Sequence, residues 1–91
     1  MDSIKKELIS NIQDALSKMD ETQLGSWTGC MQHKIVSHYG SQVEDCVQGI
    51  THSNWEKILE CIVTVLGITD PEVWIPEQLA LFATWSVECI I

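Results

Sequence analysis

Three capping-box sequences do most to constrain how this chain can fold. The pattern Ser/Thr-x-x-Glu occurs at 41–44 (SQVE), 53–56 (SNWE) and 69–72 (TDPE). In such a box the hydroxyl accepts a hydrogen bond from a free N–H in the first helical turn, and the carboxylate reaches back to the N–H of the cap residue. Gly49 and Gly67 lie where the preceding helices would end. The boxes therefore predict a succession of short helices.

Apolar residues at helical spacing predict where two of these helices run. The first is an amphipathic helix near the start of the chain, with Asp2 or Ser3 as its N-cap. Its stripe consists of Ile4, Leu8, Ile12 and Leu16. Segment 54–66 (NWEKILECIVTVL) has a wider apolar face and gives the strongest helix signal. That face comprises Trp55, Ile58, Leu59, Ile62, Val63 and Leu66, and we expect Trp55 to be a core residue.

Segment 26–40 (SWTGCMQHKIVSHYG) can be interpreted in two ways. As a helix, it aligns Trp27, Met31 and Ile35 on one face, and Gly40 is placed as its C-terminal stop. As a short hairpin, it would turn at its two glycines. The stripe is longer than any alternation, so we predict a helix and keep the hairpin as the alternative. Residues 20–23 (DETQ) are interpreted as a break or a short helical turn.

The chain ends on an apolar segment, 77–91 (EQLALFATWSVECII). We expect Pro76 to begin this last helix, after a short turn bearing Val73 and Trp74. Apolar residues surround most of the helix, and a helix of this kind is buried on all sides. Either other helices enclose it or a second chain covers one side. The predicted fold is all-α, a compact bundle of five or six short helices in a single domain over residues 1–91.

Four residues in this region form the candidate interface: Trp74, Leu81, Trp85 and Glu88. Tryptophan is enriched among the residues that dominate binding energy at protein interfaces. Trp85 lies on the side of the last helix opposite Phe82, so it is the side chain most suited to meet another chain. A symmetric homodimer is the commonest way for two identical chains to cover such a side. We therefore predict self-association through the C-terminal helix.

The charge of the chain limits its possible partners. Thirteen acidic residues oppose five lysines, which gives a net charge of −8, and there is no arginine. Nucleic-acid and anionic membrane surfaces are bound by clustered Lys and Arg, so neither is an expected ligand. A charged protein partner would carry a basic rim. Because 45% of the residues are hydrophobic in so short a chain, part of the apolar surplus should lie on the surface.

Four cysteines occur at 30, 46, 61 and 89. Each lies among apolar residues, and the start of the chain (MDSIKKELIS) is polar and does not resemble a signal peptide. Free cysteine is commonly a small buried hydrophobic residue. We therefore predict reduced thiols and a cytoplasmic location. No uninterrupted apolar run reaches the length of a transmembrane helix.

No catalytic or cofactor-binding pattern stands out, so we predict a protein without enzymatic activity or cofactor. Cys30 and His33, with three more residues, are the best metal-ligand candidates, but they contain no CxxC pair and span several predicted helices. The others are His38, Cys46 and His52. An acidic chain without arginine does not favour a reactive thiolate. The five glycines are dispersed, so there is no phosphate-binding loop.

These observations favour a small acidic protein-interaction module. One alternative is an inhibitor of the anti-restriction or anti-CRISPR type, which would block a basic nucleic-acid-binding site by charge mimicry. Another is a bundle that binds a small ligand or a metal. The series W…LGIT…EQ…W in the second half resembles the death-domain pattern, but the spacing between Gly67 and Gln78 is too short, so no residue role is carried over.

Overall fold

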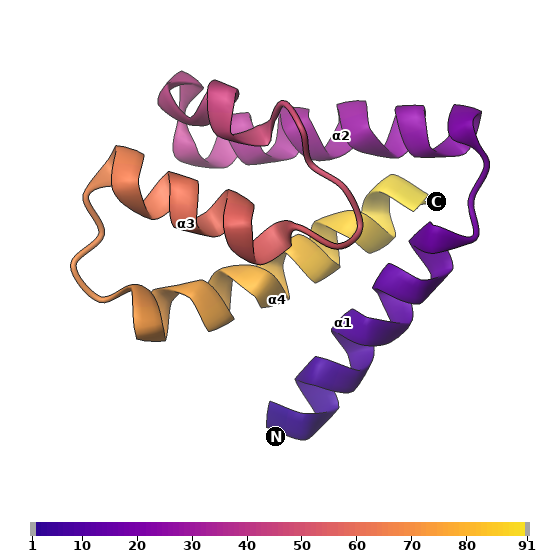
Figure 1. The fold of residues 1–91 in the computed structure, drawn as a ribbon, viewed down its shortest axis with the longest axis horizontal. Helices are drawn as coiled ribbons and strands as arrows, with labels where there is room; N and C mark the ends of the chain where they lie inside the picture. Colours follow the sequence, from indigo (N-terminus) through magenta and orange to yellow (C-terminus); the bar gives the residue numbers. More distant parts are fainter. Residues whose placement is uncertain (1, 91) are drawn as a thin grey trace.

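The computed structural model describes residues 2–90 (Figure 1). It contains four α-helices, α1 (Asp2–Ser17), α2 (Glu21–Tyr39), α3 (Trp55–Leu66) and α4 (Pro71–Ile90), and one 3₁₀ helix, η1 (Ser41–Val47). No strand occurs within residues 2–90, which confirms the all-α prediction. Since α1 already includes Asp2 and Ser3, an N-cap for this helix lies outside the described residues.

Helix α4 is the central element of the bundle. It packs against α1, α2 and α3, while η1 bridges α2 and α3. Figure 1 shows α2 and η1 along one edge, α3 beside them, and α4 running the length of the molecule towards α1. This arrangement explains the apolar circumference of α4, because three neighbouring helices cover most of it.

A single hydrophobic core lies between these helices. Its largest fully buried members are Trp27, Trp55, Phe82, Leu16, Met31, Ile35, Leu59 and Ile62. The expectation that Trp55 is a core residue is therefore confirmed, and its ring meets Phe82 edge-on with centroids 6.1 Å apart. The indole Nε1 of Trp27 donates to Ser86 Oγ at 2.8 Å, so the one hydroxyl buried within α4 has a partner.

Helix α2 confirms the helical interpretation of 26–40 and rules out the hairpin. It begins earlier than predicted because residues 20–23, interpreted as a break, form a capping box. Asp20 Oδ1 accepts from the N–H of Gln23 at 2.8 Å, and Gln23 Oε1 accepts from the N–H of Asp20 at 3.3 Å. Gly40 ends the helix as predicted, with a positive φ of 99° that favours glycine.

The three predicted capping boxes mark helix starts correctly but do not form as boxes. Residues 41–44 open a 3₁₀ helix after Gly40, with no side-chain cap. Ser53 does not cap α3, because Asn54 is its N-cap and uses its amide elsewhere, accepting from Thr51 N–H at 2.8 Å and donating to Gly49 C=O at 2.7 Å. At 69–72, the amides of Val73 and Trp74 bond to the carbonyl of Asp70, so the helix starts just after it.

The prediction that Pro76 begins the last helix is wrong. Helix α4 starts at Pro71 and continues through Pro76, so Val73 and Trp74 are helical rather than part of a turn. Proline at the first helical position is favourable, because its missing N–H would have no partner there. Inside the helix Pro76 cannot donate to the carbonyl of Glu72, four residues earlier, which therefore lacks its usual donor.

The prediction of reduced cysteines is also wrong, since the structure joins them as two disulfides. Cys30 of α2 bonds to Cys89 of α4, and Cys46 of η1 bonds to Cys61 of α3. Both pairs have Cα atoms 5.7 Å apart, a separation that a disulfide spans without backbone movement. Apolar surroundings are compatible with free and with bonded cysteine alike, and only the packing of distant helices shows which thiols meet.

We expect removal of the Cys30–Cys89 disulfide to destabilise the protein more than removal of Cys46–Cys61. In the chain-entropy description, closing a loop with a sequence separation of 59 is worth about 4 kcal/mol, and closing one of 15 about 3 kcal/mol. Denaturant unfolding of the C30A/C89A and C46A/C61A variants measures both losses. As a control, thiol titration of the denatured wild type should detect no free thiol; four reactive thiols would restore the original prediction.

Ser86→Ala should cost about 1–3 kcal/mol, because it leaves the buried Nε1 of Trp27 without an acceptor. Thr84→Ala is the matched control on the same helix, since the exposed Thr84 hydroxyl bonds only to the carbonyl of Ala80. Its effect should stay within about 0.5 kcal/mol. Thermal or denaturant melts compare the two variants, and equal losses would show that the Trp27–Ser86 bond contributes little.

Candidate functional site

The four candidate interface residues lie on one face of α4, and that face packs against α2. Trp74, Leu81, Trp85 and Glu88 follow one another at steps of seven, four and three residues, which a helix with 3.6 residues per turn brings to one side. The three apolar members are half-buried, and Glu88 is exposed. The structure places α2 over much of this face. Two details differ from the prediction: Trp74 is helical rather than part of a turn, and Trp85 is not opposite Phe82, because their ring centroids are 5.7 Å apart.

Aromatic contacts and one ion pair fasten this face to α2. The ring of Trp85 lies 5.2 Å from His38 and 6.2 Å from Tyr39, and Trp74 lies 5.7 Å from Tyr39, all between centroids. Glu88 binds Lys34 Nζ at 2.7 Å. A contact with a second chain through this face would have to use what these interactions leave exposed.

Tyr39 is the centre of this cluster, and its role was not predicted from the sequence. Its hydroxyl donates to Oε1 of Gln78, a buried side chain of α4. Burial raises the pKa of the Tyr39 phenol far above its ordinary value, because the phenolate would lose its hydration. A glutamine on an otherwise apolar helix face was the available signal, since a buried amide needs a hydrogen-bonding partner.

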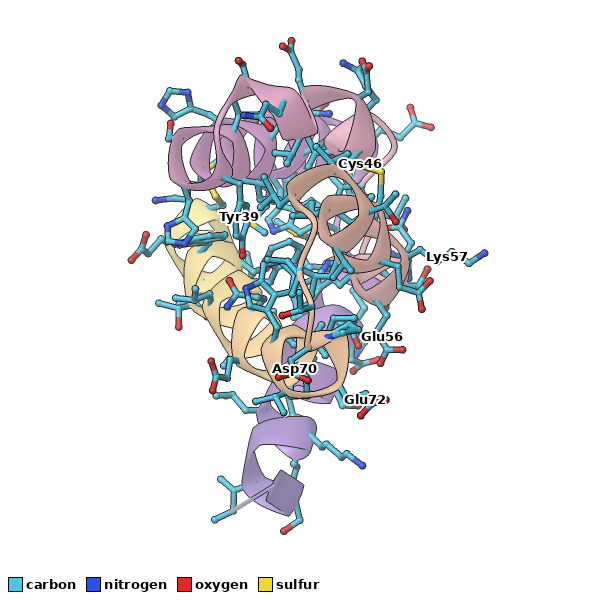
Figure 2. All side chains as sticks on the ribbon, turned by 90° about the vertical axis from the view of Figure 1, so that its left-hand side faces the viewer. Tyr39, Cys46, Glu56, Lys57, Asp70 and Glu72 are labelled. Carbon is cyan, nitrogen blue, oxygen red and sulfur yellow. A yellow bond between two sulfur atoms is a disulfide. The ribbon has the colours of Figure 1, made fainter. Side chains whose placement is uncertain are left out.

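Helix α1 has an apolar stripe that is only half covered. Leu16 and Ile12 are 0% and 7% exposed, whereas Leu8 and Ile4 on the same stripe are 55% and 69% exposed. Both views show why: the first turns of α1 project beyond the other helices (Figures 1 and 2). An amphipathic helix depends on packing of its apolar face for stability, so the exposed half lacks such packing within this chain.

A shallow apolar groove continues this uncovered stripe onto α4. It has a volume of about 420 Å³ and is lined by Leu8, Ile9, Ile12, Ala80, Ala83, Thr84, Val87 and Glu88. Small side chains on α4 make its floor, and Glu88, already paired with Lys34, is its one charged lining residue. We name the α1–α4 face as Ile4, Leu8, Ala80, Thr84 and Val87. It is the uncharged part of this surface.

A second groove lies between α1, α3 and the start of α4. Its volume is about 500 Å³, and its lining residues are Lys6, Ile9, Glu56, Pro71, Glu72, Ile75, Pro76 and Leu79. The floor is aliphatic and two carboxylates stand at the edge, so we call it the acid-edged groove. Figure 2 shows Glu56, Glu72 and Lys57 projecting to the same side of the molecule, but Lys57 does not line the groove.

The residues considered as metal ligands do not assemble into a site. Cys30 and Cys46 are disulfide-bonded and so have no thiolate to offer. Among residues whose side chains are described, no group of three or more His, Cys, Asp or Glu is close enough to hold a metal ion. No helix within the described part of the chain has the length and apolar character needed to cross a membrane.

No protein-family model matches the chain, and no curated protein and no solved structure is significantly similar to it. The resemblance of the second half to the death-domain pattern therefore gains no support. The geometry of this chain alone defines the candidate surfaces: the α1–α4 face and the acid-edged groove.

Alkaline titration tests the environment assigned to Tyr39. Because the folded state raises the pKa of this phenol, its contribution to stability is complete below the ordinary value of about 10 and is lost as the pH rises towards the folded pKa. Tyr39 is the one tyrosine in the sequence, so tyrosinate absorbance reports on it alone. We expect ionisation to coincide with unfolding; ionisation near pH 10 in the folded protein would contradict the burial.

Proposed function

We propose that the protein is a non-enzymatic protein-interaction module that self-associates as a homodimer through the α1–α4 face. The supporting observation is the exposed half of the α1 stripe, which continues into an apolar groove on α4. A two-fold arrangement would place Leu8 of each chain in the groove of the other, covering both stripes with one symmetric contact. The sequence predicted self-association as well, but through the C-terminal helix.

We propose the α1–α4 face rather than the Trp85 face for the contact between the two chains, because α2 already covers much of the Trp85 face. Helix α2 occupies much of the Trp74, Leu81, Trp85 and Glu88 face through aromatic contacts and the Lys34–Glu88 ion pair. The exposed Ile4 and Leu8 of the α1–α4 face have no such cover, and the one charged residue lining its groove, Glu88, is paired with Lys34, so two chains of net charge −8 would meet there with little local repulsion.

The two alternative functions have less support. The inhibitor alternative needs a dense row of carboxylates on one face, and the acidic residues of this chain are spread thinly along the sequence. The metal-binding alternative loses two of its ligand candidates to the disulfides. No specific observation favours either one.

The cytoplasmic location stays a prediction, and the two disulfides oppose it. Disulfides form and persist mainly in oxidising compartments, whereas cytosolic thiols are kept reduced. The location was inferred from the expectation of free thiols, so an oxidising compartment is the better-supported proposal. Trapping free thiols with an alkylating reagent at the moment of cell lysis would distinguish the two.

Leu8→Glu tests the proposed homodimer. Light scattering after gel filtration should give the wild type a mass of two chains that falls on dilution, and the variant a mass of one chain. The variant should remain folded, because Leu8 is exposed within one chain and such substitutions cost about 0.5 kcal/mol or less. A dimer should also melt at a temperature that rises with concentration.

Val65→Glu is the matched control, because Val65 is an exposed apolar residue of α3, outside the α1–α4 face. It should leave the mass of the assembly unchanged. Trp85→Glu should destabilise each chain, since it breaks the contacts with His38 and Tyr39. A wild-type mass of one chain at all concentrations would exclude the homodimer.

A further inference from the structure

The acid-edged groove combines an apolar floor with hydrogen-bond acceptors at its edge. Ile9, Ile75 and Leu79 form the floor and are only half-buried, so apolar surface remains open to a ligand. The groove follows the line where α1 meets the first turns of α4. Open apolar surface between two helices can receive the apolar face of a further helix, which presents side chains at i, i+3, i+4 and i+7.

The polar groups at the edge are nearly all acceptors. The carboxylates of Glu56 and Glu72 are exposed, and neither forms an ion pair among the described residues. Pro76 adds a third acceptor, because it leaves the carbonyl of Glu72 without its usual donor inside the helix. Lys6 is the one cationic residue in the lining, and it pairs with neither carboxylate.

We propose that the acid-edged groove binds a basic amphipathic helix of another protein. The apolar face of that helix would lie on Ile9, Ile75 and Leu79, and its lysine or arginine side chains would donate to Glu56, Glu72 and the Glu72 carbonyl. The net charge of −8 attracts such a partner from a distance. The inference rests on the proposed interaction function and does not depend on self-association.

Charge favours this partner over a second copy of the chain as the occupant. A second copy carries the same net charge of −8, so the repulsion between two acidic chains outweighs the two lysines, Lys5 and Lys6, that follow its exposed Ile4 in the sequence. Leu8 lines the groove on one side of α1 and Lys6 lines the groove on the other. Ile9 lines both grooves, but none of the five residues that define the α1–α4 face lines the acid-edged groove, so self-association through that face would leave Glu56, Glu72, Ile75 and Leu79 available to a different protein.

A pair of synthetic peptides tests the inference. One is an amphipathic helix with leucines at i, i+3, i+4 and i+7 and lysine and arginine on both flanks, and the other has glutamates in place of these basic residues. We expect calorimetry to show saturable binding of the basic peptide, with NMR shift changes centred on Ile9, Ile75 and Leu79. Equal binding of both peptides, shifts centred elsewhere, or no binding at all would overturn the proposal.

Matched variants distinguish local recognition from overall charge. E56Q/E72Q should weaken binding of the basic peptide about tenfold. E44Q/D45N makes the same charge change on η1, at exposed residues outside the groove, and should weaken binding less than about twofold. Equal losses in the two double variants would show non-specific attraction and contradict the proposed site.

Two further variants complete the test. Pro76→Ala restores an N–H for the Glu72 carbonyl, so it should raise thermal stability while weakening peptide binding about fivefold; greater stability with unchanged binding would remove the carbonyl from the proposal. Leu8→Glu should bind the basic peptide as the wild type does. A wild-type protein that stays monomeric but binds the basic peptide overturns only the proposed self-association. A wild-type protein that dimerises but does not bind the basic peptide overturns only this inference.

Discussion

The structure depends on enclosing one helix that is apolar around most of its surface. Helix α4 has few polar side chains, so its burial requires neighbours on several sides. Three helices supply them, and two specific interactions fix the packing: the Trp27–Ser86 hydrogen bond and the Cys30–Cys89 disulfide. Both connect α2 to α4 across a sequence separation of 59 residues. The position of every other element follows from its contact with this pair or with α3.

Much of the fold could be predicted from the sequence, because helix periodicity is a local property. The stripe of α1, the wide apolar face of α3 and the stop at Gly40 are encoded within a few residues of one another. Exact helix starts were less predictable, because several side chains compete for the same backbone groups. Asn54 occupies the N-cap position of α3, but its side chain bonds to its own loop, and Asp20 caps α2 by accepting from the backbone N–H of Gln23.

The disulfides and the candidate surfaces were harder to predict, for a different physical reason. They depend on which faces meet across the molecule, and residue spacing carries no such information. The sequence predicted Leu81, Trp85 and Glu88 on one side of the last helix and Trp74 in a turn before it, but could not show that the helix would include Trp74 or that α2 would lie against this side. Nor could it show that the stripe of α1 would be buried at Leu16 and open at Ile4.

The two cross-links are nested, since the Cys46–Cys61 loop lies inside the loop closed by Cys30 and Cys89. All of α1 precedes Cys30 and lies outside both loops, and α4 is its main neighbour. The disulfides therefore do not hold this helix covalently, and it is kept in place by packing, chiefly of Ile12 and Leu16 in the core. Sub-global opening of one helix requires less free energy than unfolding the whole domain. Helix α1, whose stripe is open at Ile4 and Leu8, is thus also the helix whose local opening the two disulfides oppose least.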